Sequence, residues 1–327
     1  MKNRVQVLDG WRGISILLVL AGHLLPLGPK SWQLNSALAA TGMAIFFILS
    51  GFLITTILMR DSNIGAFLIR RFMRIIPLAW LIMLVALIST SSPRSLYLPH
   101  LLFYANWGSV YTIPPTSHLW SLCVEMQFYV MVALLVLQLR ARSFFILPVL
   151  CLSVTVFRYV NSVEISIYTQ YRIDEILAGC VLALVYNNKG VIMNAIGKLS
   201  PLYLCPLLIL SAHPLGGFTA YFRPYLALLL IGSTLSTKDG AWWEKWLTCS
   251  TLVYIASISY ALYVFHGVLR HTWLGDGDTF EKYAKRPLLF AMTFGLAHLS
   301  TFYYEKYFIQ LGKRITSSPS ETQVATE

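Results

Sequence analysis

The chain has 327 residues, of which 57% are hydrophobic and 12% charged, and its mean hydropathy is +0.64. Because soluble globular proteins carry about 25% charged residues, this composition excludes an ordinary soluble domain and predicts a polytopic membrane protein. The formal net charge of +11 does not indicate a nucleic-acid partner, since the basic residues lie in short connectors between apolar segments rather than on one polar face.

The apolar segments are numerous enough for about ten membrane-spanning helices, because each span needs about 20 mostly apolar residues. We therefore expect an all-α fold, a polytopic transmembrane helix bundle in the lipid bilayer. Its helices are expected at 11–28, 37–59, 75–91, 119–138, 143–160, 172–187, 199–212, 221–236, 248–271 and 287–311.

The connectors predict the orientation of this bundle. If the N-terminus is cytoplasmic, most of the 25 Lys and Arg residues fall on the cytoplasmic side, as the positive-inside rule requires. The basic connector 270–286 is the exception. We therefore expect both termini in the cytoplasm, one transmembrane domain over 1–314, and a disordered polar tail over 315–327.

The first expected helix carries two ionisable side chains. Arg12 lies near its cytoplasmic end, and His23 follows eleven residues later inside the apolar run. Eleven residues make about three turns and ~16 Å of rise, so the two side chains share one helix face. Ionisable groups inside a membrane commonly mark a functional path; the alternative is a histidine that is hydrogen-bonded within the bundle for packing.

The next two elements carry motifs that admit two interpretations each. Ser50 and Gly51 lie in a long apolar segment, where small residues either permit close helix packing or let a ligand approach the backbone. Arg71 and Arg74 are spaced i, i+3 and share a helix face, whereas Arg70 points elsewhere. Such arginines either set topology and contact lipid headgroups or hold phosphates through their planar forks.

A glutamate, Glu125, lies among apolar residues of the expected helix 119–138. His118 and Ser121 precede it by seven and four residues, so all three side chains share one face. A carboxylate in this setting needs a partner or a proton. It is therefore either part of a functional site or paired with an arginine for packing.

Weaker signals occur later in the chain. Arg172, Asp174 and Glu175 begin the segment 172–187 and could be only a charge group at a helix end. Tyr263 and His266 share a face of the segment 248–271, either in a site or in an aromatic belt with one satisfied histidine. The five cysteines lie in apolar segments without a C-x-x-C pair, so we expect inert buried thiols and no metal site.

Six stretches of the sequence, in order, resemble the motifs of the acyltransferase-3 family of integral membrane acyltransferases. They are LDGWRGISILLVLAGH (8–23), FFILSGFLIT (46–55), RRFMRIIP (70–77), HLWSLCVEMQFY (118–129), RIDEILAGCVLA (172–183) and SYALYVFHG (259–267).

The resemblance implies a multi-pass enzyme of the bacterial inner membrane. It implies that an acyl group, commonly acetyl, moves from cytoplasmic acyl-CoA to a hydroxyl of a cell-envelope or lipid-linked polysaccharide, with lipopolysaccharide among the acceptors. Some members carry a fused SGNH hydrolase-like domain, and we expect this protein to act without one. We therefore expect either direct transfer or hand-over to a separate extracytoplasmic transferase.

The resemblance also implies residue roles. We expect His23 to act as general base or as a transient acyl-histidine, with Glu125 orienting it, and Arg12, Arg71 and Arg74 to hold the phosphates of acyl-CoA. The remaining motif residues are expected to bind substrate or support the site: Asp9, Ser50, His118, Trp120, Ser121, Arg172, Asp174, Tyr263 and His266.

Two other functions stay open at this stage. A proton-coupled secondary transporter could use His23, Glu125 and Asp174 as a proton relay and the arginines to bind an anionic or sugar substrate. The two related halves that transporters often show are not visible in the sequence. A non-catalytic membrane scaffold would leave the three ionisable clusters without an explanation.

Overall fold

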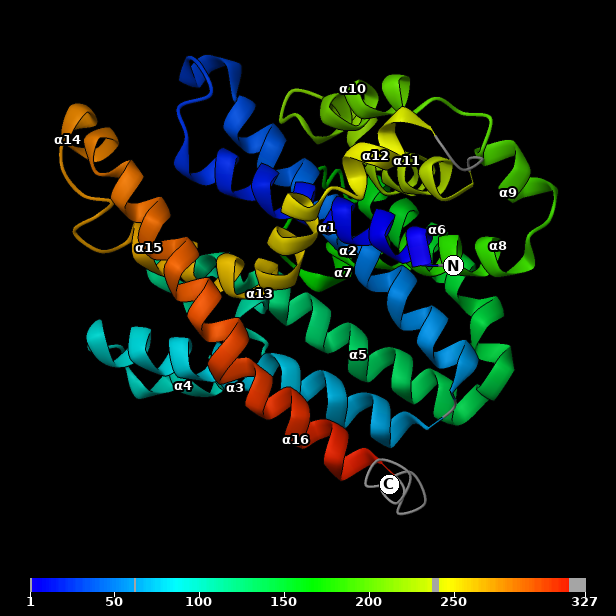
Figure 1. The fold of residues 1–327 in the computed structure, drawn as a ribbon, viewed down its shortest axis with the longest axis horizontal. Helices are drawn as coiled ribbons and strands as arrows, with labels where there is room; N and C mark the ends of the chain where they lie inside the picture. The colour runs from blue at the N-terminus through cyan, green and yellow to red at the C-terminus, as the bar shows by residue number, and fades with distance from the viewer. Residues whose placement is uncertain (1, 62, 237–240, 318–327) are drawn as a thin grey trace.

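The computed structural model of the protein describes residues 2–61, 63–236 and 241–317. Within these residues the chain forms helices and no β-strand, which confirms the all-α class (Figure 1). The last helix ends at Thr316, and residues 318–327 of the expected tail lie outside the described residues.

The longer helices follow one another in the order α1 (Lys2–Leu24), α2 (Leu34–Arg60), α3 (Ile64–Ser89), α5 (Trp120–Leu139), α6 (Ser143–Val160), α8 (Asp174–Asn188), α10 (Pro201–Ala212), α11 (Arg223–Ser236), α13 (Ser250–Arg270), α15 (Arg286–Leu299) and α16 (Lys306–Thr316). Short helices lie in the connectors: α4 (Tyr97–Leu101), α7 (Thr169–Arg172), α9 (Val191–Ile196), α12 (Trp242–Leu247) and α14 (Thr279–Ala284). A π-helical turn, Ser300–Glu305, joins α15 to α16, and the three run as one long element across the bundle in Figure 1.

The described residues contain five helical stretches that are long and apolar enough to cross a membrane. They are Gln6–Leu24, Lys30–Arg60, Ile64–Ser89, Pro114–Val160 and Ser250–Arg270, and a sixth span results if Pro201–Ala212 and Gly217–Leu235, bent by 119°, count as one. These stretches confirm a membrane-spanning helix bundle.

The expected number of ten spans stays a prediction, as does the cytoplasmic position of both termini. All ten expected segments fall on helical structure, but α8, α10 and α11 have 15, 12 and 14 residues. At 1.5 Å per residue these helices are ~18–22 Å long, which is less than the ~30 Å hydrocarbon core of a bilayer.

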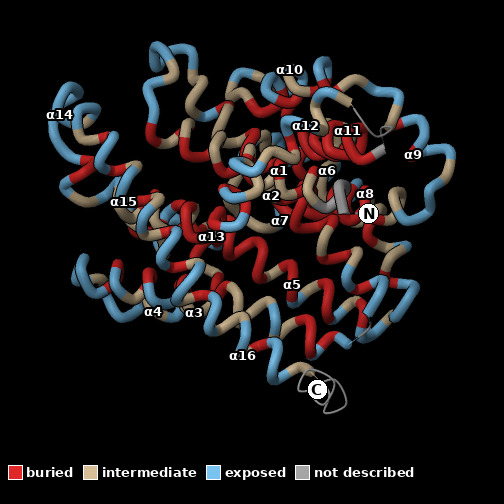
Figure 2. Tube along the Cα trace, in the orientation of Figure 1, coloured by how far each residue is buried: buried red, intermediate tan, exposed pale blue. Residues whose placement is uncertain are grey.

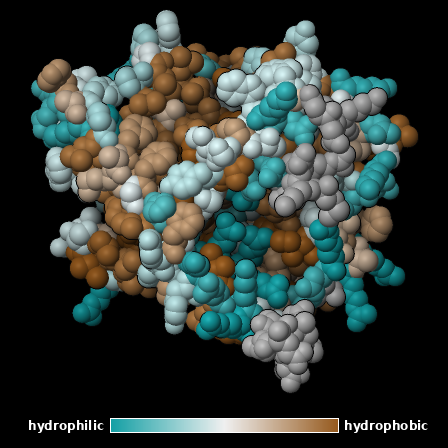
Figure 3. Space-filling model, viewed as in Figure 1, coloured by the Kyte–Doolittle hydropathy of each residue, from teal (hydrophilic) through white to brown (hydrophobic). Residues whose placement is uncertain are grey.

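The surface and the interior differ as a membrane bundle requires. Buried segments concentrate in the middle of the molecule, and α9 and α14 are largely exposed (Figure 2). Apolar side chains cover much of the face seen in Figure 3. Exposed residues such as Leu81, Val85 and Ile88 of α3 fit contact with lipid rather than with water.

Helix α2 packs against α1 on one side and α8 on another. A Cβ atom built on Gly51 would lie 1.9 Å from the carbonyl oxygen of Ile176, and one built on Gly179 would lie 2.2 Å from that of Ile48. Two backbones therefore touch where α2 crosses α8. Of the two interpretations of the Ser50–Gly51 pair, the structure supports close helix packing for Gly51.

We predict that Gly51→Ala lowers the thermal stability of the purified protein, because the added methyl meets backbone that cannot move aside. Overpacking of this kind costs about 1–3 kcal/mol, so the midpoint of thermal unfolding in detergent should fall by several degrees. Gly295→Ala on α15 is the matched control, since a Cβ there meets nothing within 4 Å. Equal midpoints for the two variants would contradict the proposed backbone contact.

Candidate active site

One cavity of about 80 Å³ lies between α1, α2, α3, α5 and α13. Three guanidinium groups and one carboxylate line it, with several hydroxyls and an apolar wall from α1 and α2. We call it the arginine cavity. Its polar and aromatic lining residues are Arg12, Ser15, Phe46, Ser50, Arg71, Arg74, Ser121, Glu125, Tyr129, Ser259, Tyr260 and Tyr263. The structure thus brings the three arginines of the sequence motifs to one cavity.

The arginines of this cavity differ in their partners. Arg12 pairs with Asp9 at 3.5 Å, one turn earlier on α1. The Cζ atom of Arg71 lies 6.0 Å from the ring centre of Phe67, and neither Arg71 nor Arg74 forms an ion pair with any described carboxylate. Unpaired guanidinium groups beside a cavity suit a ligand that carries negative charge.

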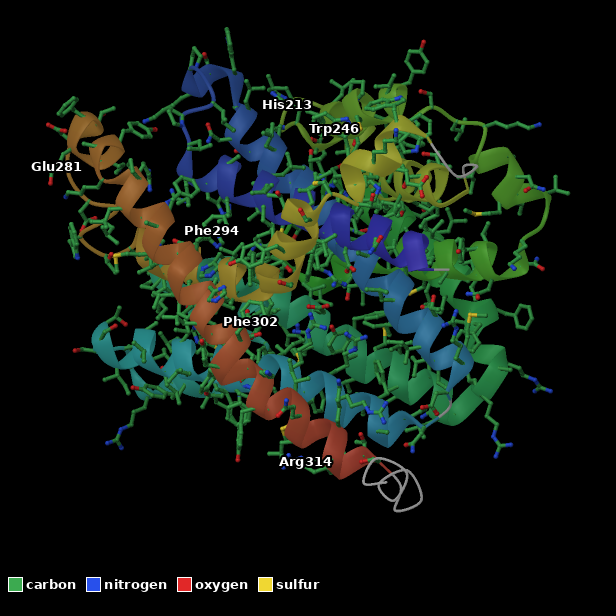
Figure 4. The ribbon with its side chains drawn as sticks, viewed as in Figure 1. His213, Trp246, Glu281, Phe294, Phe302 and Arg314 are labelled. Atoms are coloured by element: carbon green, nitrogen blue, oxygen red, sulfur yellow. The ribbon has the colours of Figure 1, made fainter. Side chains whose placement is uncertain are left out.

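Contacts from α13, from the π-helical turn Ser300–Glu305 and from α16 hold the part of α3 that carries these arginines. The hydroxyl of Tyr260 donates to one carbonyl of α3 at 2.6 Å, and that of Tyr304 donates to another at 3.3 Å. Arg70 is exposed and donates to the hydroxyl of Thr316 at 2.7 Å, at the end of α16 where Figure 4 labels Arg314. Arg70 therefore points away from the cavity, as its helical position predicts.

Glu125 is buried and belongs to the arginine cavity. Its Oε1 atom accepts hydrogen bonds from the hydroxyls of Ser50 and Tyr129, each at 2.5 Å. The structure does not bring Glu125 to His23, which corrects the expectation that this carboxylate orients that imidazole. The reason is their level in the bundle: Val19 lines the arginine cavity, but His23, one turn further along α1, lines a different one.

This second cavity has a volume of about 220 Å³ and is lined by Ser117, Trp120, Gly267, Arg270 and four histidines, His23, His118, His266 and His271. We call it the histidine cavity. Nδ1 of His23 lies 2.9 Å from Nε2 of His266, and the two rings stack with an angle of 8° between their planes. The edge of the His118 ring packs against His266, with ring centres 5.0 Å apart.

Side chains that contact one another separate the two cavities. Tyr263 lines the arginine cavity, and its hydroxyl donates to the backbone carbonyl of His118 and accepts from Ser121 at 2.7 Å. Its ring also contacts that of His266, with centres 5.5 Å apart. Arg12, Ser15, Ile16 and Val19 line the arginine cavity, and His23, one turn beyond Val19, lines the histidine cavity. The two cavities therefore lie end to end along one face of α1, the face that the spacing of Arg12 and His23 predicts.

Arg172 and Asp174 line neither cavity and belong to a buried charge cluster instead. Asp174 pairs with Arg158 at 2.5 Å, and Glu175 pairs with Arg223 at 2.6 Å and with Arg172 at 3.1 Å. The guanidinium group of Arg172 also lies over the ring of Trp120, 5.4 Å from its centre. Trp120 lines the histidine cavity, so this charge cluster helps to hold one wall of that cavity in place.

Several lining residues were missed at the sequence level. Helical spacing could have placed two of them, since Tyr129 follows Glu125 by four residues and Arg270 follows His266 by four. Ser117 lies in a short 3-10 helix, Pro114–Leu119, and His271 follows the last residue of α13, so the α-helical periodicity does not predict where either side chain points. Among the described residues, no group of three or more His, Cys, Asp or Glu side chains has an arrangement that could hold a metal ion.

The sequence of the chain is similar to those of several known proteins. The chain is 26% identical to an O-acetyltransferase, provisionally so named, of Staphylococcus aureus (strain COL), over 83% of this chain and 52% of the relative. It is also 26% identical to the peptidoglycan O-acetyltransferase OatA of Listeria monocytogenes, over 81% of this chain and 49% of the relative.

A third relative is a protein of Bacillus subtilis (strain 168), provisionally named peptidoglycan O-acetyltransferase YrhL, with 26% identity over 79% of this chain and 47% of the relative. The chain spans about half the length of these curated relatives. No solved structure gives a significant match. The family model described as "Acyltransferase domain" matches residues 5–305, and the chain therefore belongs to the acyltransferase-3 family.

Proposed function

We propose that the protein moves an acyl group, acetyl in the simplest case, from cytoplasmic acyl-CoA to a hydroxyl of a cell-envelope glycan. The observation that carries this proposal is the pair of cavities along one face of α1, one lined by arginines and the other by histidines. An enzyme that joins a donor from one side of a membrane to an acceptor from the other needs a donor site and an acceptor site that adjoin inside it.

The arginine cavity suits the donor. Acyl-CoA carries several phosphates, and Arg71 and Arg74 offer guanidinium groups without a described counter-charge. The pantetheine arm of acyl-CoA would reach from these arginines toward the histidine cavity. The ~16 Å between the levels of Arg12 and His23 gives the length over which this arm would extend along α1.

The histidine cavity suits the acceptor. It opens at the end of α1 that lies opposite the N-terminus, which is the extracytoplasmic end in the orientation that the connectors predict. In the proposed reaction an imidazole nitrogen of His23 takes the proton of the acceptor hydroxyl, whose oxygen attacks the thioester carbon. The carbon–sulfur bond breaks, and the proton passes to the CoA thiolate. In a two-step variant His23 itself attacks and carries the acyl group.

Glu125 contributes on the donor side in this scheme. Its carboxylate holds Ser50 and Tyr129 beside the arginine cavity and is the only carboxylate among the described lining residues. It thereby balances part of the positive charge of the three arginines when no donor is bound. Peptidoglycan is the acceptor named for two of the relatives, and this supports a cell-wall glycan as the acceptor class.

Arg71 and Arg74 test the donor site. A hydrogen bond to a charged phosphate contributes about 1.5–3 kcal/mol, so Arg71→Ala or Arg74→Ala should raise the KM for acetyl-CoA roughly 10- to 150-fold. Arg→Lys should restore only part of this loss, because it keeps the charge but not the planar fork. The measurement is transfer of labelled acetyl groups from acetyl-CoA to glycan in inside-out vesicles.

Arg70→Ala is the matched control for this pair. Arg70 lies in the same basic cluster but is exposed and faces away from the cavity, so its removal should leave the KM for acetyl-CoA unchanged. If all three alanine variants instead lose insertion to a similar degree and keep a normal KM, the cluster serves topology and the donor binds elsewhere.

His23→Ala should lower acyl transfer at least 10²- to 10⁴-fold, the range that a general base contributes, while binding of acetyl-CoA stays near that of the parent protein. His298→Ala is the control, because His298 is exposed on α15 and hydrogen-bonds only to Tyr254 among the described residues. Near-normal transfer by well-expressed His23→Ala protein would remove the imidazole from the reaction. Transport of a glycan without any dependence on acetyl-CoA would favour the transporter alternative.

A further inference from the structure

We propose that His266 is a positioning residue that holds His23 in one tautomer, with the proton on Nδ1 and the lone pair of Nε2 directed to the histidine cavity. This inference rests on the proposed function, because it specifies how His23 is prepared to take a proton or an acyl group. A residue of α13 thereby sets the protonation of His23 on α1, although the two helices are far apart in the sequence.

The Nδ1 atom of His266 carries a proton. This atom lies 2.6 Å from the backbone oxygen of Tyr263 and 3.3 Å from that of Leu262. Carbonyl oxygens accept hydrogen bonds and cannot donate them, so Nδ1 of His266 must carry a proton. Both carbonyls belong to the same helix as His266, and the helix therefore sets this arrangement by its own geometry.

The proton on His266 determines which nitrogen of His23 is protonated. A neutral imidazole that is protonated at Nδ1 presents a lone pair at Nε2. Nε2 of His266 lies 2.9 Å from Nδ1 of His23, so His23 must donate from Nδ1. Its own lone pair is then on Nε2, the nitrogen that a general base or a nucleophile would use.

The alternative proton arrangement requires a charged His266 that donates to His23. His266 is fully buried, and its described ring contacts are His23, His118 and Tyr263, none of which is an anion. No described carboxylate pairs with it. Burying an unpaired charge costs far more than burying a neutral ring with both nitrogens hydrogen-bonded, and the neutral arrangement is therefore the one we assign.

The free nitrogen of His23 faces open space. Nε2 of His23 has no hydrogen-bond partner among the described residues, and it is not one of the buried atoms that lack a partner. His23 lines the cavity of about 220 Å³. An acceptor hydroxyl that enters this cavity can therefore reach the lone pair directly.

The neighbouring ring keeps the pair in place. His118 packs its edge against His266 and is itself anchored by a contact of 3.1 Å from its Nε2 to the backbone oxygen of Val264. It fits closely over Gly267, where an added Cβ would lie 2.1 Å from its Nδ1 atom. His266 can therefore neither turn nor withdraw from His23 without displacing a packed ring.

Two substitutions of His266 separate a positioning role from other roles. His266→Leu removes the group that accepts the hydrogen bond from Nδ1 of His23. The kcat for acyl transfer should then fall by about 10²- to 10⁴-fold, the loss seen when a general base is removed or carries its proton on the other nitrogen. The KM for acetyl-CoA should change little, because the arginine cavity is untouched. His266→Gln supplies an amide oxygen to His23 and an amide N–H to the backbone carbonyl, and should keep kcat within about tenfold of the parent protein.

The tautomer can also be read directly. In protein labelled with ¹⁵N at its seven histidines, the signals that disappear in His23→Ala belong to His23. Their chemical shifts should show a protonated Nδ1 and an unprotonated Nε2 in the parent protein and in His266→Gln. This measurement decides the matter even if His266→Leu fails to fold.

Three results would overturn the inference: a proton on Nε2 of His23 in the parent protein, undiminished kcat in His266→Leu, or folded His266→Gln as inactive as His266→Leu. The last would mean that His266 must carry charge during the reaction. Failure of the proposed function is a separate outcome, because the His23→Ala variant would then still transfer acyl groups. If His23→Ala is inactive but His266→Leu is fully active, only the proposal that His266 sets the tautomer of His23 is refuted.

Discussion

The close approach of α2 to its neighbours is the constraint on which the site depends. Gly51 lets the backbone of α2 touch α8, and neighbouring side chains on a helix point about 100° apart, so Ser50 faces α5 and donates to Glu125. The hydroxyl of Ser15 on α1 donates to the carbonyl of Gly42 on α2 at 2.9 Å. With α1 packed against α2 and α13, residues along one of its faces line both cavities.

Charge is distributed unevenly inside this bundle. Arg158, Asp174, Glu175 and Arg223 are almost fully buried and form short ion pairs with one another, as buried charges must. The arginine cavity differs, because its three arginines line it together with only one carboxylate among the described residues. Arg71 and Arg74 lie in one cavity without an ion pair to any described carboxylate; this costs stability, and a protein retains such a cost where a ligand relieves it. This contrast is the electrostatic argument for an anionic donor.

The sequence predicted well what depends on local periodicity. Long apolar segments marked the helices, and the spacing of Arg12 and His23 placed both on one face of α1. It could not predict pairings between distant helices: His23 meets His266 across 243 positions, and Glu125 meets Ser50 rather than His23. Nor could it predict that Asp174 turns inward to Arg158, because a charge group at a helix start looks the same whether water or another helix faces it.

The layer between the cavities bears on the choice between an acyltransferase and a transporter. Tyr263 is held by hydrogen bonds to Ser121 and to the backbone of His118. The same helix carries His266, whose Nδ1 atom is hydrogen-bonded to the backbone oxygen of Tyr263. A transporter must open such a layer wide enough for a whole substrate and close it again. An acyltransferase needs only a carbonyl carbon to come within reach of an oxygen or nitrogen on the other side. Side chains that are tied by hydrogen bonds to the linings of both cavities meet the second requirement without large motion, and the geometry therefore favours group transfer over transport.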